Sequence, residues 1–144
     1  MNPFAFAACF AIAAVLACMT ARADDAHTLP ADQPATVNGI DVACTGIGDE
    51  AQTDPRWPEY AVRIEFADGQ AQYLADIDIT IADAKGEVLL QLRCDSPWFL
   101  AKLAPGKYTV SGTYQDRLTK TAKFTAPKSG QARIVVRFPE VVSE

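Results

Sequence analysis

The sequence predicts an all-β protein, a Greek-key β-sandwich of about seven strands. From residue 60 onward apolar side chains recur at every second position, which is the period of a half-buried strand. Turn-forming residues separate these runs at intervals of roughly 8 to 12 residues, and no long segment has helical periodicity. Short alternating strands with this spacing are typical of a β-sandwich rather than of an α/β fold.

Residues 1–23 have the pattern of an export signal. Residues 4–19 form an uninterrupted apolar run, and residues 21–23 (Ala-Arg-Ala) have the small-x-small form of a cleavage site. The run is shorter than the roughly 20 residues of a membrane span, so the mature form is expected to have none. Residues 15–18 also resemble a bacterial lipobox ending at Cys18. The predicted location is periplasmic or secreted, with a lipoprotein anchored at Cys18 as the alternative.

The remaining chain divides into a flexible leader over residues 24–35 and a β-sandwich domain over residues 36–144. The leader is polar, proline-spaced and without periodicity. Early in the domain, Asn38 and Gly39 mark a turn in a short strand. Residues 48–54 favour one helical turn with acidic residues at its start, and Pro55 and Pro58 stop anything longer.

Seven further runs carry the strand pattern. In the first of them Val62, Ile64 and Phe66 share one face, and Arg63 and Glu65 take the other. The run over residues 98–103 is apolar on both faces, so it is either central in the sandwich or partly exposed. The predicted strands cover residues 62–66, 74–81, 88–93, 98–103, 108–114, 118–125 and 132–138.

A Pro-Gly turn is the clearest landmark of the predicted fold. Pro105 presets φ at the second position of a tight turn, and Gly106 supplies positive φ at the third. The turn is expected to reverse the chain, with Tyr108 opening the next strand. These three residues mark architecture and carry no expected chemistry.

Two of the four cysteines, Cys44 and Cys94, remain after removal of the predicted signal. An even pair in an oxidising compartment predicts a disulfide. A redox or metal-binding pair is disfavoured because no CxxC occurs and His27 is the single histidine. The disulfide is therefore expected to be structural, and no cofactor is predicted.

Composition and motifs exclude several function classes. A net charge of −5 argues against binding of nucleic acid or an anionic membrane surface. One histidine is too few for a catalytic zinc or a triad base, no G-x-S-x-G occurs, and no spacing singles out a carboxylate pair. Asp76, Asp78, Asp83 and Glu87 could be read as calcium ligands, but Asp76 and Asp78 would lie about 7 Å apart on one strand face. A solvated face is the simpler interpretation, and we expect neither a metal nor an enzyme.

Two tryptophans are the candidate interaction residues. Trp57 lies in a proline-flanked loop and Trp98 follows Pro97, so either ring could stack on a sugar or anchor a partner protein. The alternative is that both rings close the ends of the sandwich beside the disulfide. Trp98 is the better candidate for burial and Trp57 for binding, because loops carry function.

Residues 73–138 resemble the carboxypeptidase regulatory-like domain, a transthyretin-like β-sandwich. The resemblance rests on the strand over 76–81, the turn over 83–86 and the Pro-Gly segment over 103–110, with residues 46–50 as an N-terminal counterpart. It implies the transthyretin fold and similarity to small stand-alone exported proteobacterial proteins of no assigned activity. In the peptidases that name the family this domain follows a zinc catalytic domain, for which this sequence has no counterpart.

The predicted function is therefore a non-catalytic exported module that acts by protein or ligand contact in the bacterial envelope. The alternative is a carbohydrate-binding or carbohydrate-processing accessory protein, which rests on the two tryptophans and the acidic residues. An envelope protein or a glycan is the expected partner, and the sequence gives no oligomeric state.

Overall fold

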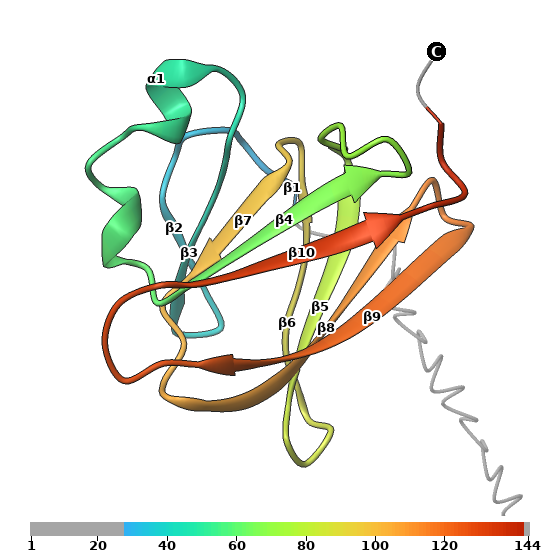
Figure 1. Cartoon of the computed structure of the whole chain (residues 1–144). Helices are drawn as coiled ribbons and strands as arrows, with labels where there is room; N and C mark the ends of the chain where they lie inside the picture. Colours follow the sequence, from blue (N-terminus) through green and yellow to red (C-terminus); the bar gives the residue numbers. More distant parts are fainter. Residues whose placement is uncertain (1–27, 143–144) are drawn as a thin grey trace, which may run out of the picture.

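Two five-stranded β-sheets pack face to face in the computed structural model, which describes residues 28–142 (Figure 1). The predicted signal, its lipid-anchored alternative and His27 lie outside the described residues. The elements in chain order are β1 (Thr28–Leu29), β2 (Ala35–Val37), β3 (Ile40–Thr45), α1 (Asp49–Gln52), the 3-10 helix η1 (Trp57–Glu59), β4 (Val62–Asp68), β5 (Ile77–Asp83), β6 (Val88–Cys94), β7 (Trp98–Ala101), β8 (Gly106–Tyr114), β9 (Leu118–Ala126) and β10 (Ala132–Phe138).

Sheet A has the strand order β1-β6-β5-β8-β9 and sheet B the order β10-β4-β7-β3-β2. Both sheets are mixed, because β1 pairs parallel with β6 and β10 pairs parallel with β4. The all-β sandwich is confirmed, but the described residues form ten strands and not about seven. The difference arises near the N-terminus, where β1 lies within the predicted leader and Asn38 and Gly39 divide one expected strand into β2 and β3.

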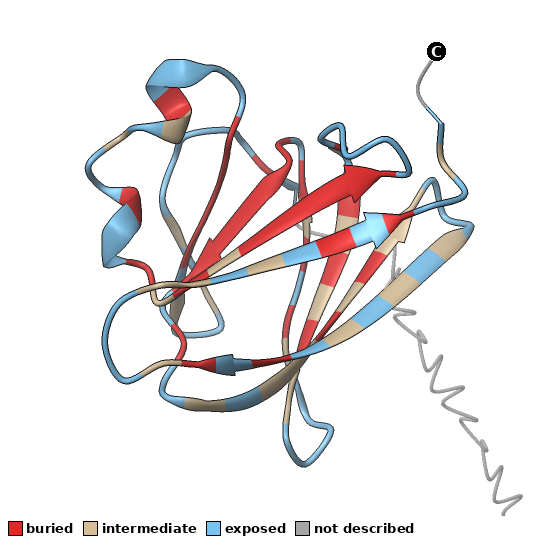
Figure 2. Ribbon diagram, viewed as in Figure 1, coloured by how far each residue is buried: buried red, intermediate tan, exposed pale blue. Residues whose placement is uncertain are grey.

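The core lies between the sheets and follows the alternation that the sequence predicts. Val62, Ile64 and Phe66 of β4 are fully buried, and every second residue of β5 faces them from the other sheet. Strand β7 is buried on both faces, as its apolar run allowed (Figure 2). Its position explains this, because β7 is the central strand of sheet B and a helical segment covers its outer face.

Strands β3 and β4 both pair antiparallel with β7, one on each side, and so run parallel to each other. Parallel strands cannot be joined by a tight hairpin and need a crossover of a dozen or more residues. Residues 46–61 provide it, and they carry α1 and η1 across the outer face of sheet B (Figure 1). The predicted helical turn is thus confirmed as α1, which ends before Pro55.

The predicted leader contributes to the paired structure from Thr28 onward. Leu29 is buried and lies opposite Cys94 in β6, and Ala31 forms a parallel bridge with Cys44 in β3. The Asp32 N–H donates to the Cys44 carbonyl at 2.8 Å. The paired region therefore begins before residue 36, because this segment crosses from sheet A to sheet B.

The segment around Pro105 connects the two sheets and does not make a hairpin. It joins β7 of sheet B to β8 of sheet A, which corrects the expectation of a simple chain reversal. Gly106 is already the first residue of β8. Its φ of 155° confirms the predicted positive φ, a conformation that residues with a side chain rarely adopt. The Tyr108 hydroxyl donates to the Ala104 carbonyl at 2.6 Å and holds this connection against β8.

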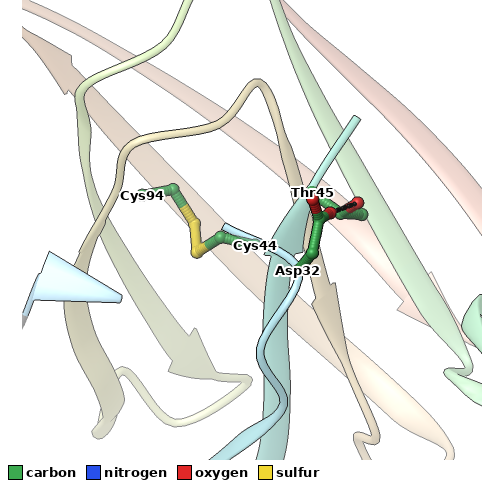
Figure 3. The surroundings of a disulfide bond; sticks show 4 residues. All are labelled: Asp32, Cys44, Thr45 and Cys94. Carbon is green, nitrogen blue, oxygen red and sulfur yellow. Dashed lines mark hydrogen bonds between the residues drawn. A yellow bond between two sulfur atoms is a disulfide. The ribbon is translucent and has the colours of Figure 1, made fainter. Parts of the chain in front are cut away.

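The predicted disulfide between Cys44 and Cys94 is confirmed, and it joins β3 of sheet B to β6 of sheet A (Figure 3). Both cysteines are fully buried. The bridge is therefore a covalent tie between the two layers of the sandwich, with the N-terminal segment lying against both of its ends.

Replacing both cysteines, Cys44→Ala with Cys94→Ala, is expected to lower the free energy of unfolding by about 2 to 4 kcal/mol. The closed loop spans 50 residues, and removing such a cross-link returns conformational entropy to the unfolded chain. Denaturant unfolding with and without a reductant measures this change. The reduced native protein should match the double variant, and equal stability of all three samples would contradict a structural role.

Candidate functional site

The outer face of sheet B brings together the two segments that the sequence singled out, the Trp57 loop and the Trp98 strand. The crossover lays Trp57 and Tyr60 over Ala43 of β3 and Leu100 of β7, and these four residues form a separate buried cluster. Gly46, at the start of the crossover, lies against the indole of Trp98. The two tryptophans therefore occupy neighbouring parts of one sheet face.

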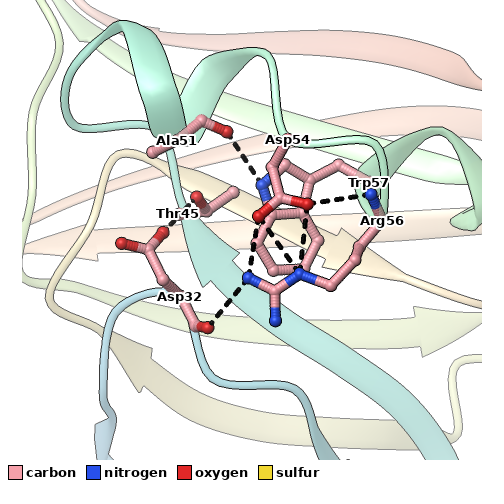
Figure 4. Close-up of polar contacts among 6 residues, drawn as sticks. All are labelled: Asp32, Thr45, Ala51, Asp54, Arg56 and Trp57. Atoms are coloured by element: carbon pink, nitrogen blue, oxygen red, sulfur yellow. Dashed lines mark hydrogen bonds and ion pairs between the residues drawn. The ribbon is translucent and has the colours of Figure 1, made fainter.

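Trp57 is a buried residue and not an exposed loop anchor, with 3% of its surface accessible. The indole Nε1 of Trp57 donates to the Ala51 carbonyl at 2.8 Å (Figure 4). Gln131 Nε2 donates to the backbone carbonyl of Trp57 at 2.9 Å. The Arg56 guanidinium lies 4.5 Å from the ring centroid and pairs with Asp54. This indole fixes the crossover to the sheet, which leaves its faces closed to a stacking ligand.

Trp98 is also buried, with 5% of its surface accessible, as expected for the better candidate for burial. The Arg63 guanidinium carbon lies 4.3 Å from the ring centroid, and Tyr73 meets the indole edge-on at 6.2 Å between ring centroids. A Cβ at Gly46 would lie 2.6 Å from Trp98 Cγ, so glycine is required for this close approach. The backbone at Gly46, the guanidinium of Arg63 and the phenol of Tyr73 thus enclose the Trp98 ring.

A buried carboxylate lies beside Trp98 at the centre of this face. Glu65 of β4 has 1% of its surface accessible, although alternation placed it correctly on the side opposite Val62, Ile64 and Phe66. Its side chain lies opposite Trp98 in the pairing of β4 with β7, and opposite Val135 in the pairing of β4 with β10. The carboxylate therefore lies outside the core, and side chains on the outer face of sheet B shield it from solvent.

Three side chains surround the carboxylate. Arg133 donates from both Nε and Nη2, the second bond measuring 3.1 Å to Oε1, and the Tyr73 hydroxyl donates to Oε1 at 2.9 Å. Arg63 Nε lies 3.2 Å from Oε2 as an ion pair, without hydrogen-bond geometry. We call these residues, with Trp98, the Glu65 cluster: Arg63, Glu65, Tyr73, Trp98 and Arg133.

Burial by itself would raise the pKa of the Glu65 carboxyl, because it penalises the charged form. Hydrogen bonds from Arg133 and Tyr73 and the charges of both arginines outweigh that penalty, so the pKa lies below its ordinary value. Glu65 consequently stays ionised and holds two cations against the sheet. Both of its oxygens are occupied by hydrogen bonds or ion pairs, which leaves no free carboxylate for proton transfer.

The cluster holds more cations and donors than one carboxylate can satisfy. Arg63 donates no hydrogen bond to a described residue, and the Nε1 of Trp98 is buried without a hydrogen-bond partner among residues 28–142. By contrast, Arg56 has its own carboxylate in Asp54, and Lys102, which lies over Tyr60, pairs with Glu59 at 3.9 Å. The surplus positive charge of this face is therefore at the Glu65 cluster.

Two of the four residues considered for calcium, Asp78 and Asp83, have other partners. Asp78 accepts from Arg93 at 2.7 and 2.8 Å, and Asp83 Oδ1 accepts the backbone N–H groups of Lys85 and Glu87. Between residues 28 and 142, no three His, Cys, Asp or Glu side chains gather in an arrangement that could hold a metal ion. In the same range no helix has the length and apolar character to cross a membrane.

No family model matches this chain, and no curated protein matches it either. The site therefore has to be interpreted from its own geometry.

Four of the five cluster residues escaped sequence reasoning: Arg63, Glu65, Tyr73 and Arg133. Opposite charges at alternating positions of β4 and β10 were visible as a signal. The parallel pairing that sets Arg133 beside Arg63 could not be seen in the sequence. The two strands are about 70 residues apart, and no local pattern encodes their register.

We expect the stability of the native protein to fall as the pH drops below about 4.3, the ordinary pKa of glutamate. Glu65 has a lowered pKa in the folded state, so its contribution is complete above that pH and is lost as the pH falls through the folded pKa. Glu65→Gln should remove this part of the acid sensitivity and lower the free energy of unfolding at neutral pH by about 1 to 3 kcal/mol.

Denaturant unfolding at a series of pH values measures both effects. Glu50→Gln is the control, since Glu50 is an exposed carboxylate on α1 without an ion pair among the described residues. It should reproduce the native profile. If Glu65→Gln kept the native acid profile, the interpretation of the cluster would be wrong.

Proposed function

We propose that this protein is a non-catalytic exported β-sandwich module that acts by contact with a partner protein through the outer face of sheet B. The observation that carries the proposal is a set of exposed apolar and aromatic side chains at the Glu65 cluster: Tyr73, which belongs to it, and Ile47 and Val135, which lie beside it. Ile47, Tyr73 and Val135 are 63%, 45% and 40% exposed, respectively. Apolar and aromatic side chains interspersed with arginine are the composition enriched at protein interfaces.

The three exposed residues adjoin the cluster directly. Ile47 follows Gly46, which contacts Trp98; Tyr73 bonds to Glu65; and Val135 lies beside Glu65 in the sheet. The hydrogen bonds and ring contacts beneath them hold this surface in one conformation. A preorganised surface loses little entropy on binding, which favours recognition.

Export and family membership are parts of the same proposal. The disulfide is compatible with an extracytoplasmic location, and the two-sheet sandwich is compatible with the transthyretin-like, carboxypeptidase regulatory-like assignment. A lipid anchor at Cys18 stays the alternative to a soluble periplasmic or secreted form. The intact mass of the mature protein distinguishes a chain that begins at Asp24 from one that begins with an acylated Cys18.

A photo-activated cross-linking side chain at position 135 is expected to capture a partner protein in the native cell envelope. Val135 suits this because it is exposed and its side chain has no polar contact to lose. Position 88 is the matched control, since Val88 is 50% exposed but lies on β6 of sheet A. Capture by position 135 alone supports the proposal, and equal capture by both positions or by neither contradicts it.

A hollow on sheet A favours a second candidate function, the binding of a small acidic sugar. It has a volume of about 630 Å³ and lies against β8, β9 and the β5–β6 hairpin. Lys107 and Lys123 line it, and neither has a carboxylate partner among the described residues. Thr109 and Thr125, which lie opposite these lysines, are also without a side-chain hydrogen bond in that range.

Lys107→Gln and Lys123→Gln are each expected to weaken binding of a hexuronate at least tenfold, because each removes a cation from the hollow. Chemical-shift titration with hexuronate, and with the neutral hexose as a second probe, measures this. Arg117→Gln is the charge-matched control at the opposite end of the β8–β9 hairpin. Equal binding of both sugars, or an equal loss in the control, would dismiss this candidate.

A further inference from the structure

The outer face of sheet B carries three arginines and a single carboxylate around the Glu65 cluster. Arg133 and Arg63 are paired neighbours on β10 and β4, and Arg137 lies four residues farther along β10 on the same face, beyond Val135. The Nε of Arg63 has no hydrogen-bond partner among the described residues, and Arg137 is exposed. In a chain with a net charge of −5, this is a local surplus of positive charge.

The spacing of these arginines suits an extended segment. Neighbouring strands lie about 4.8 Å apart, and side chains on one face of a strand repeat about every 7 Å. Arg63 and Arg133 can therefore share one carboxylate across the strands, and Arg137 can reach a second one farther along. An extended peptide with acidic residues four positions apart presents its carboxylates about 14 Å apart, which is the spacing of Arg133 and Arg137, and the residue midway between them lies over Val135.

The guanidinium groups of this face have little carboxylate to pair with. Glu65 accepts hydrogen bonds from Arg133 and Tyr73 and forms an ion pair with Arg63, whose Nε has no hydrogen-bond acceptor within residues 28–142. That Nε is buried, so a partner would meet the exposed part of the Arg63 side chain, which is 25% accessible, and the Arg133 side chain, which is 56% accessible. A partner carboxylate would give these two guanidinium groups a second acceptor.

The neighbouring apolar residues decide the class of partner. Val135 lies between Arg133 and Arg137 on β10, Tyr73 donates to Glu65, and Ile47 follows Gly46 beside Trp98; all three are exposed. A protein segment can offer apolar side chains between its carboxylates, whereas nucleic acids and acidic polysaccharides offer none. The surface thus combines charge complementarity with apolar complementarity.

We propose that the Glu65 cluster and Arg137 bind an acidic, extended segment of a partner protein, with one carboxylate held between Arg63 and Arg133. This inference rests on the proposed contact function and adds the chemistry of the partner. Glu65 acts as a positioning residue: it orients the two guanidinium groups and does not meet the partner itself.

The test uses a fluorescent nine-residue peptide, Glu-Ser-Val-Ser-Glu-Ser-Val-Ser-Glu, whose Glu and Val side chains share one face when the peptide is extended. The same peptide with Gln in place of each Glu is the uncharged probe. Fluorescence anisotropy with the full mature protein should show Kd at least tenfold lower for the Glu peptide. Arg63→Gln and Arg137→Gln should each raise that Kd at least fivefold, and Arg117→Gln, on sheet A, should leave it unchanged. In Arg63→Gln the hydrogen bonds from Arg133 and Tyr73 to Glu65 remain, and Arg137 is exposed, so both variants should fold, and the thermal midpoint verifies this.

Equal affinity for the two peptides, or an equal loss in Arg117→Gln, would overturn the inference. Polyglutamate binding as tightly as the Glu/Val peptide would also overturn it, because charge alone would then suffice. The proposed function fails separately. If position 135 captures a partner whose recovery is unchanged by Arg63→Gln and Arg137→Gln, the contact function stands and the acidic segment does not.

Discussion

The parallel relation of β3 and β4 is the constraint on which the candidate site depends. Because both strands flank β7, the chain between them has to cross the outer face of sheet B. That crossing covers half of the face with Trp57 and Tyr60 and sets Gly46 against Trp98. The other half stays uncovered by backbone, so side chains alone close it. The division into a covered and an open half follows from topology.

In the open half, a buried charge organises its neighbours. Glu65 lies on the outward side of β4, yet the arginines and the phenol of Tyr73 exclude solvent from it. A buried carboxylate is stable only when paired, so the covering side chains are fixed by the charge they cover. The same contacts leave Arg63 over the indole of Trp98 with its own donors unused. The Glu65 cluster is therefore both held in one conformation and left with a hydrogen-bond donor that has no acceptor among the described residues.

Most of the strands could be predicted from the sequence, because alternation is a local signal. The run over 62–66, the burial of Trp98 and the pairing of Cys44 with Cys94 could all be predicted from composition and period. The assignment of strands to sheets could not be predicted in this way. The link through Pro105 has the residues of a tight turn but joins two layers, and Arg133 meets Arg63 only through a long-range parallel register. The site depends on those non-local pairings.

The N-terminal segment has a consequence for the order in which the protein can fold. Leu29 pairs beside Cys94, some 65 residues later in the chain, and Ala31 pairs beside Cys44. During synthesis or passage through a membrane from the N-terminus, the first strand therefore emerges long before its partner strand. Such long-range pairings fold slowly, since the chain has to close a large loop before they form. Strand β1 is therefore synthesised early but pairs late, and the edge of β6 that it covers stays open until then.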